Sequence, residues 1–305
     1  MNKKIYKVAI IGLGKAGFLY SVKKDKFFSH SEAIIKNKRL KLIAGVDNNK
    51  NRLKSFEKKY NIKSYFSINK LLKNEKFDLA IISVPTEKQF MVIKNLLKLI
   101  KNKTVLCEKP CTMNLRQINL IQKISKIKKI KFYVNFQRNS LKSSKVIKKI
   151  INREKLATIN VTYSQGVLNS ASHYISLFLS FFSYNYLNLI KFKNYKSTIK
   201  KDFLSKFKIK YKKVKINFIP KKNYKKIHGA FEVIGQKFNI KYLFGGRKIL
   251  IKDNLSGNII KIKSDIQNSQ LYVYNQLIKS LDRKKNTLCS IYNAIETFKI
   301  IKKIK

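Results

Sequence analysis

An apolar run near the N-terminus leads directly into three closely spaced glycines, Gly12, Gly14 and Gly17. The run, residues 8–11, predicts a buried strand, and the residues after Gly17 predict a helix. In such a strand–turn–helix unit the first glycine permits a tight turn, the second lets a pyrophosphate approach the backbone, and the third allows close packing of helix on strand. The amides at the start of the helix would then bind phosphate. The spacing therefore predicts a dinucleotide-binding α/β domain.

The rest of the first half alternates apolar runs with segments of helical period. The predicted strands are residues 7–11, 40–46, 77–84, 104–107 and 130–134, and the predicted helices are residues 51–60, 67–73, 87–100 and 114–128. Strands that are apolar almost throughout and are separated by helices indicate a parallel sheet covered on both faces. Right-handed crossovers then predict a Rossmann-type, doubly wound sheet.

The pattern changes near residue 137. Helices are predicted at 141–152, 170–183, 269–282 and 290–304, a strand at 158–163, and alternating polar and apolar runs at 206–218, 231–244 and 248–252. Alternation is typical of antiparallel strands with one solvated face. We therefore expect a Rossmann domain over residues 1–137, followed by an α+β substrate and oligomerisation domain with a largely antiparallel open sheet over residues 138–305.

The chain is strongly basic, with 69 Lys and Arg against 15 Asp and Glu and a formal charge of +54. A polyanion partner is one explanation, since neutralising phosphates releases counterions. However, only seven of the cations are arginines, and the lysines are spread through nearly every predicted element. An AT-rich coding bias would also enrich Lys, Asn, Ile, Phe and Tyr together. We favour solvated lysine surfaces and expect no specific nucleic-acid partner.

Three cysteines, Cys107, Cys111 and Cys289, provide no disulfide framework and suit a reducing cytoplasm. No further Cys or His follows Cys107 and Cys111 at metal-ligand spacing, so we expect structural thiols and no metal site. The aromatic-rich stretch 174–186 is too short and too polar to cross a bilayer, which predicts a cytoplasmic protein without membrane attachment.

Asp47 follows the predicted strand 40–46 and is expected to bind the ribose hydroxyls of the adenosine. An acid there repels a 2′-phosphate, which favours NAD, although Lys50 and Arg52 nearby leave NADP open. A turn-forming role for Asp47 is the structural alternative. Asp47 lies farther beyond Gly17 than is usual, so residues 20–30 are expected to contain an insertion that forms a lip over the cofactor.

Several motifs in a fixed order resemble the Gfo/Idh/MocA family of oxidoreductases, which includes glucose–fructose oxidoreductase and inositol 2-dehydrogenase. The motifs are Ala9–Gly17, Ala44–Asp47, Ser83-Val84-Pro85-Thr86, Cys107-Glu108-Lys109-Pro110, Phe132–Arg138 and Gly166-x-x-Asn169-x-x-Ser172-His173. The resemblance implies a nicotinamide cofactor at the carboxyl edge of the first sheet. The residues it places at the cofactor are Gly12, Gly14, Lys15, Ala16, Gly17, Asp47, Pro85, Thr86, Gln89, Glu108 and Lys109, with Gln89 standing where many relatives have His.

The same resemblance implies that Lys109 and His173 handle the alcohol proton. Asn169 stands where the family often has Asp, four residues before His173 on the same helical face, and an amide cannot accept the proton. We therefore place Lys109, His173 and Asn169 in the catalytic set, while a solvated lysine and a structural histidine remain the alternatives.

Three further residues, Arg138, Tyr163 and Gln165, are candidate substrate contacts, whereas His30 and His228 are interpreted as structural or surface residues. The resulting hypothesis is an NAD(P)-dependent oxidoreductase. It would move a hydride between nicotinamide and a secondary alcohol or ketone of a sugar, sugar acid, cyclitol or nucleotide-linked sugar, with polysaccharide biosynthesis as one setting. The alternative is a non-catalytic sensor or scaffold that binds NAD(P) and a sugar. A homodimer or homotetramer is a family-level expectation.

Overall fold

The computed structural model describes residues 3–20, 28–112, 114–154, 157–182, 187–195, 202–221 and 229–304. Residues 21–27 of the expected insertion, as well as His228, lie outside this part of the chain. The protein forms two compact units. The first unit contains Met1–Gln137 and Gln267–Tyr292, and the second unit contains Arg138–Ile266 and Asn293–Lys305.

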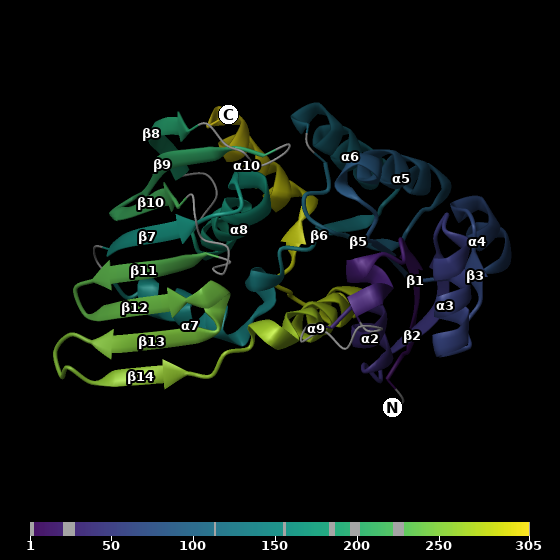
Figure 1. Ribbon diagram of the computed structural model, residues 1–305, viewed down its shortest axis with the longest axis horizontal. Helices are drawn as coiled ribbons and strands as arrows, with labels where there is room; N and C mark the ends of the chain where they lie inside the picture. The colour runs from purple at the N-terminus through teal and green to yellow at the C-terminus, as the bar shows by residue number, and fades with distance from the viewer. Residues whose placement is uncertain are drawn as a thin grey trace. The chain divides into compact units, whose positions relative to one another are not determined.

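The first unit is built on a seven-stranded sheet in the order β15-β6-β5-β4-β1-β2-β3. Its strands are β1 (Tyr6–Ile11), β2 (Leu40–Val46), β3 (Ser64–Tyr65), β4 (Leu79–Ile82), β5 (Thr104–Cys107), β6 (Lys131–Val134) and β15 (Cys289–Ser290). All pairs are parallel except β15 with β6. β1, β4 and β5 are buried at nearly every position because helices cover both faces (Figure 1). The predicted Rossmann sheet is confirmed.

The helices of this unit are α2 (His30–Ile35), α3 (Lys50–Tyr60), α4 (Ile68–Asn74), α5 (Thr86–Leu99), α6 (Leu115–Ile127) and α9 (Ser269–Leu281). Polar side chains cap four of them: Ser29, Asn49, Ser67 and Asn114 each accept a hydrogen bond from a first-turn amide. α5 and α6 lie on the opposite side of the sheet from α2 and α9 (Figure 1).

The segment Gln267–Tyr292 belongs to the first unit, although its sequence position suggested the second domain. In α9, Val273, Tyr274 and Leu277 enter the same core cluster as residues of β1 and α2. The Arg39 guanidinium binds the Asp282 carboxylate at 2.8 Å just after α9. Helical periodicity shows that a segment has an apolar face, but it does not show which sheet buries that face.

The second unit contains an eight-stranded sheet in the order β14-β13-β12-β11-β7-β10-β9-β8. Its strands are β7 (Ala157–Tyr163), β8 (Leu187–Tyr195), β9 (Leu204–Tyr211), β10 (Val214–Pro220), β11 (Ala230–Gly235), β12 (Phe238–Leu243), β13 (Lys248–Asp253) and β14 (Ile259–Ile262). Every pair is antiparallel except β7 with β10. The expected open, largely antiparallel sheet is confirmed.

One face of this sheet packs on α7 (Lys142–Ile151), α8 (Ser172–Phe181) and the end of α10 (Ile291–Lys303) through a single apolar cluster. The other face is polar, and in β9 exposed lysines alternate with buried Phe207 and Ile209. This alternation is what the sequence pattern predicted for a half-solvated strand.

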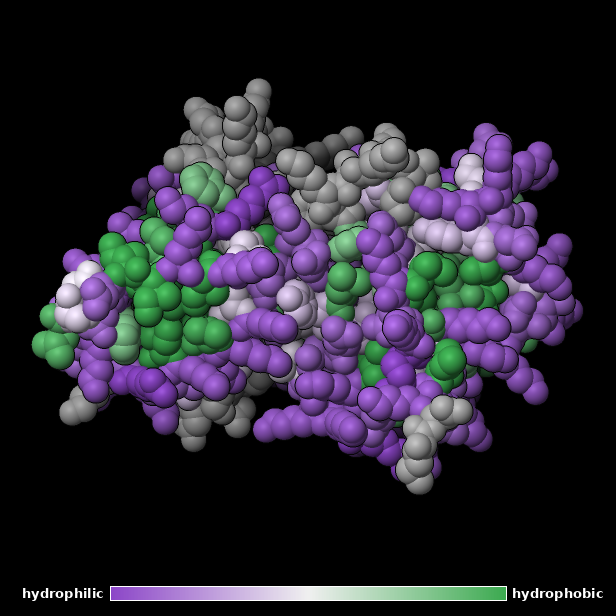
Figure 2. Space-filling model, turned by 90° about the horizontal axis from the view of Figure 1, so that it is seen from below, coloured by the Kyte–Doolittle hydropathy of each residue, from purple (hydrophilic) through white to green (hydrophobic). Residues whose placement is uncertain are grey.

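Hydrophilic side chains cover most of the face in Figure 2, and hydrophobic side chains are interspersed among them. Among the residues that the structure describes, no helix is long and apolar enough to cross a membrane.

Candidate functional site

The glycine motif forms a tight turn between β1 and the short helical segment Lys15–Leu19. Gly12 has a φ of +100°, and a Cβ atom on Gly17 would lie only 2.0 Å from the Gly12 carbonyl oxygen. The Ser83 hydroxyl donates to the same oxygen at 2.7 Å, which ties the end of β4 to the turn. By contrast, a Cβ atom on Gly14 would meet nothing within 4 Å. Gly14 thus leaves open space where a phosphate can approach the backbone.

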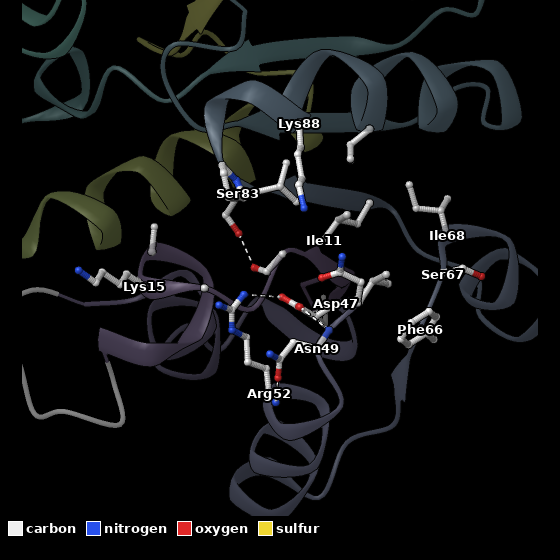
Figure 3. Close-up of a pocket in the computed structure, with 18 residues that line it drawn as sticks. Ile11, Lys15, Asp47, Asn49, Arg52, Phe66, Ser67, Ile68, Ser83 and Lys88 are labelled. Atoms are coloured by element: carbon white, nitrogen blue, oxygen red, sulfur yellow. Dashed lines mark hydrogen bonds and ion pairs between the residues drawn. The ribbon is translucent and has the colours of Figure 1, made fainter. Parts of the chain in front are cut away.

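A pocket of about 660 Å³ opens beside this turn. Its lining comes from the carboxyl ends of β1, β2 and β4 and from the starts of α3, α4 and α5 (Figure 3). The lining residues are Ile11, Gly12, Gly14, Lys15, Ala16, Val46, Asp47, Asn48, Asn49, Arg52, Phe66, Ser67, Ile68, Ser83, Val84, Pro85, Lys88 and Val92. In parallel α/β sheets ligands bind at this edge. The pocket is large enough for an adenosine and a pyrophosphate and therefore fits the expected dinucleotide.

Asp47 combines a structural role with a place in the pocket. Its Oδ2 accepts a hydrogen bond from the Leu13 amide at 2.8 Å, and its Oδ1 accepts one from the Asn49 amide at 2.9 Å. The Arg52 guanidinium lies 3.5 Å from Oδ2 (Figure 3). The carboxylate therefore fixes the glycine turn and still lines the pocket, and its oxygens retain lone pairs for ligand hydroxyls.

Two lysines line the pocket from different elements. In Figure 3 the Lys88 amine reaches from the first turn of α5 toward the pocket, whereas the Lys15 amine points away from the other labelled side chains. Lys88 was not among the residues predicted from the sequence. Because it stands one position before Gln89 in a helix, only the helical phase decides which of the two faces the pocket.

A second cavity of about 260 Å³ shares Ala16 with the first and is also lined by Tyr20, Phe28, Glu108, Gln137, Ser269 and Gln270. Glu108 directly follows β5, just as Asp47 follows β2. The order β5-β4-β1-β2 places these two acids three strand spacings apart, about 14 Å. The two cavities share Ala16 at the sheet edge, with Asp47 lining one and Glu108 the other.

Glu108 is held by two side chains of the first unit. Its Oε1 accepts hydrogen bonds from His30 Nε2 at 2.9 Å and from Asn135 Nδ2 at 2.6 Å. Burial alone would raise the pKa of this carboxyl, but the hydrogen bonds from His30 and Asn135 and the charge of Lys109 outweigh it, and the pKa is lowered. Glu108 is therefore an ionised acceptor at neutral pH. Sequence reasoning assigned no site role to His30 or Asn135.

The remaining predicted residues of the first unit lie near this edge. Lys109 is half-buried directly after Glu108, and Thr86 begins α5. The Gln89 side chain is buried, where its amide donates to the Val84 carbonyl oxygen at 3.1 Å and its Oε1 accepts from the Cys107 thiol at 3.3 Å. These contacts give Gln89 a structural role, and its contact with a cofactor stays a prediction.

Asn169 and His173 belong to the second unit, where Gly166 precedes their helical segment with a φ of +83°. The Asp202 carboxylate accepts hydrogen bonds from the Leu168 amide at 3.0 Å and from the Asn169 amide at 2.9 Å. A carboxylate thus lies against the Asn169 backbone, although the side chain at this position is an amide. This carboxylate belongs to Asp202, 33 residues away in the chain, so a local motif could not predict it.

The three predicted substrate contacts also lie in or beside the second unit's sheet. Gln165 is exposed, but the Tyr163 side chain is buried in the core cluster and its hydroxyl bonds to the backbone of Ser205. Arg138 is buried, with its guanidinium 5.0 Å from the ring centre of Tyr174. Packing therefore explains Tyr163 and Arg138 within this unit, and their contact with substrate stays a prediction.

Comparison with known proteins supports the interpretation of the first unit. Residues 6–136 match the model of the oxidoreductase family with an NAD-binding Rossmann fold, GFO_IDH_MocA. This domain belongs to that family. The resemblance that the motifs indicated is confirmed. No curated protein sequence matches the chain.

Solved structures share the fold over almost the whole chain. The dehydrogenase MviM from Clostridium difficile is 20% identical with a TM-score of 0.80, covering 99% of both chains. The WlbA dehydrogenase from Bordetella pertussis, crystallised with NADH and UDP-GlcNAcA, is 15% identical with a TM-score of 0.76, covering 100% of this chain and 95% of its own. A super-repressor mutant of Gal80p from Saccharomyces cerevisiae is 12% identical with a TM-score of 0.83, covering 98% of this chain and 95% of its own. At these identities the likeness shows the fold alone.

Proposed function

We propose that this protein is an NAD(P)-dependent oxidoreductase that acts on a secondary alcohol or ketone of a sugar-type substrate. The observation that carries the proposal is the pair of cavities at the first sheet's carboxyl edge, which share Ala16, with Asp47 lining one and Glu108 the other. The bound nicotinamide would supply hydride chemistry, and the protein would supply orientation and electrostatics.

The residues of the first unit divide the binding task. The Gly12–Gly17 turn holds the pyrophosphate, Asp47 accepts from the adenosine ribose, and Glu108 accepts from the second nucleoside in the smaller cavity. Asp47 favours NAD, because its charge repels a 2′-phosphate. Lys109 and His173 are the proposed proton-handling groups, with Asn169 orienting them by hydrogen bonding.

A nucleotide-linked or acidic sugar is the substrate class that we favour. The chain's formal charge of +54 attracts anions, and the WlbA dehydrogenase, which shares the fold, was crystallised with UDP-GlcNAcA. We further propose a cytoplasmic homodimer or homotetramer without a specific nucleic-acid partner.

A non-catalytic sensor is the second candidate, because Asn169 cannot accept a proton and Gal80p, named as a repressor, shares the fold. Single-turnover mixing of the protein with NAD and a panel of sugars, including nucleotide-linked sugar acids, separates the two. Enzyme activity predicts NADH absorbance, whereas tight cofactor binding without NADH across the whole panel would favour the sensor.

Lys109→Ala sharpens this test. If Lys109 handles the proton, turnover falls by about 100-fold or more while ADP-ribose binding remains within twofold of the wild type. Turnover near the wild-type rate would remove Lys109 from the mechanism.

A further inference from the structure

His30 is completely buried at the start of α2, and both of its ring nitrogens are engaged. Nε2 lies 2.9 Å from Glu108 Oε1, and Nδ1 lies 2.9 Å from the Tyr274 hydroxyl oxygen in α9. Three segments distant in the chain therefore meet at one imidazole, and all three belong to the first unit.

The Glu108 carboxylate fixes the direction of one of these hydrogen bonds. An ionised carboxylate only accepts, so Nε2 must carry the proton that binds Glu108. In the neutral form of the imidazole the other nitrogen is then an acceptor, and the Tyr274 hydroxyl donates to Nδ1. Burial raises the pKa of Tyr274 well above its ordinary value, and the charge of Glu108 adds to this, which keeps the hydroxyl proton in place. For the neutral imidazole, the geometry thus selects the Nε2–H tautomer of His30.

The consequence is a fixed carboxylate at the cavity. His30 and Asn135 both bind Oε1 of Glu108. Of the Glu108 side chain, 16% is exposed, and Glu108 lines the 260 Å³ cavity, which shares Ala16 with the larger pocket. With Oε1 engaged by two donors, Oε2 is the oxygen available to accept from a ligand hydroxyl.

We propose that His30 and Tyr274 are positioning residues, which hold Glu108 as a fixed acceptor for the hydroxyl groups of the second nucleoside of the cofactor. This inference rests on the proposed dinucleotide function. Through Tyr274, the C-terminal segment would thus help to position Glu108 in the first unit's cavity. The competing explanation is that His30 only stabilises the fold. A positioning role predicts that His30 variants weaken binding of the second nucleoside alone, whereas a purely structural role predicts equal effects on both halves of the cofactor.

Four variants separate them. His30→Leu removes both hydrogen bonds, whereas His30→Gln retains an amide donor near the Nε2 position. Tyr274→Phe removes only the hydroxyl that sets the tautomer. Tyr133→Phe is the matched control, because its buried hydroxyl also bonds to the end of α9, at 2.7 Å from Ser280 Oγ and not to His30 or Glu108.

Calorimetric binding of NAD and of ADP to the full-length variants gives the first readout, since ADP lacks the second nucleoside and its hydroxyl groups. We expect His30→Leu to weaken NAD by about tenfold and Tyr274→Phe by about threefold, with ADP changed less than twofold. His30→Gln should recover most of the loss, and Tyr133→Phe should change neither ligand. Equal weakening of both ligands, or no weakening of NAD, would overturn the inference.

The second readout needs no ligand. The chain has only three histidines, so ¹⁵N NMR of the imidazoles resolves His30, which is assigned by its absence in His30→Gln. We expect the Nε2–H tautomer in the wild type and a loss of that preference in Tyr274→Phe but not in Tyr133→Phe. An Nδ1–H tautomer in the wild type would overturn the inference. If the wild type bound neither NAD nor ADP, the proposed function would fail as well, an outcome distinct from NAD binding that is unaffected by the His30 variants.

Discussion

The two units use their carboxylates in different ways. In the first unit Asp47 and Glu108 line the cavities at the sheet edge. In the second unit the carboxylates of Glu154, Asp202 and Asp265 accept hydrogen bonds from backbone amides. The chain has only 15 acidic residues against 69 basic ones, so the places where acids are kept are informative.

Glu154 is the clearest case in the second unit. Its carboxylate accepts from the amides of Gln236 and Lys237, in the turn between β11 and β12, and of Phe238, the first residue of β12. Asp265 similarly accepts from the first two amides of α7. These acids replace water at buried backbone groups. A carboxylate that lines a cavity suggests ligand binding, whereas a carboxylate that accepts hydrogen bonds from several backbone amides suggests a role in stabilising the fold.

Substitutions in the glycine turn should have the largest effects of the changes considered. They test whether the first unit, like the acids above, uses some positions for folding and others for ligand binding. Gly17→Ala places a methyl group 2.0 Å from the Gly12 oxygen, so we expect a loss of about 3 kcal/mol or more in unfolding free energy. Gly14→Ala is the matched control, because its methyl group meets no protein atom. Denaturant unfolding should leave Gly14→Ala near the wild type, while NAD titration shows its binding lost. Equal stability of the two variants would contradict this account.

Glu154→Gln tests the assignment in the second unit. An amide NH₂ would face backbone N–H groups, so we expect a loss of about 2 kcal/mol in unfolding free energy with cofactor affinity unchanged. Glu232→Gln is the control, since its ion pair with Lys241 is long, at 3.8 Å, and solvated; its effect should stay within about 0.5 kcal/mol. A drop in NAD affinity for Glu154→Gln would break the contrast between the units.

Asp47 lies between the two classes, because it accepts backbone amides and also lines the pocket. Asp47→Asn removes the charge that repels a 2′-phosphate, and it releases Arg52 to bind one. Its NH₂ also loses the hydrogen bond from the Leu13 or the Asn49 amide, which weakens both cofactors alike, so the affinity ratio isolates the effect of the charge. We expect the ratio of NADP to NAD affinity to rise by about tenfold, and Arg52→Ala in the same background to reverse most of that rise. An unchanged ratio in titrations with both cofactors would count against Asp47 as the ribose ligand.

The smallest effect concerns pH. The pKa of Glu108 is lowered in the folded protein, so its stabilisation is present above its unfolded pKa and is lost as pH falls through the folded value. Below about pH 4.5 the unfolding free energy of the wild type should therefore fall more steeply with falling pH than that of Glu108→Gln. Parallel pH curves for the two proteins would show that the His30 contact does not contribute.

The sequence predicts regular elements well where the pattern is local. β2 and β5 begin and end where the apolar runs do, because turn-forming or charged residues flank each run. β14 was missed, since its four residues are largely exposed and have little alternation to detect. α2 was missed because it has only six residues.

The site was predictable where it follows a strand and not where it depends on distant contacts. Gly12, Asp47 and Glu108 each follow a strand end, so the parallel order alone brings them to one edge. His30 was interpreted as structural or surface, since its partners are 78 and 244 residues away. No local pattern encodes such a contact.

The return of Gln267–Tyr292 to the first unit has a consequence for synthesis on the ribosome. A nascent chain of 137 residues already carries the glycine turn and Glu108, but Tyr274 and β15 are translated much later. At 5–20 residues per second, roughly 8 to 30 seconds pass before residue 292 is added. Until then α2 and β6 present an uncovered apolar surface, which makes the unfinished chain a candidate for chaperone binding.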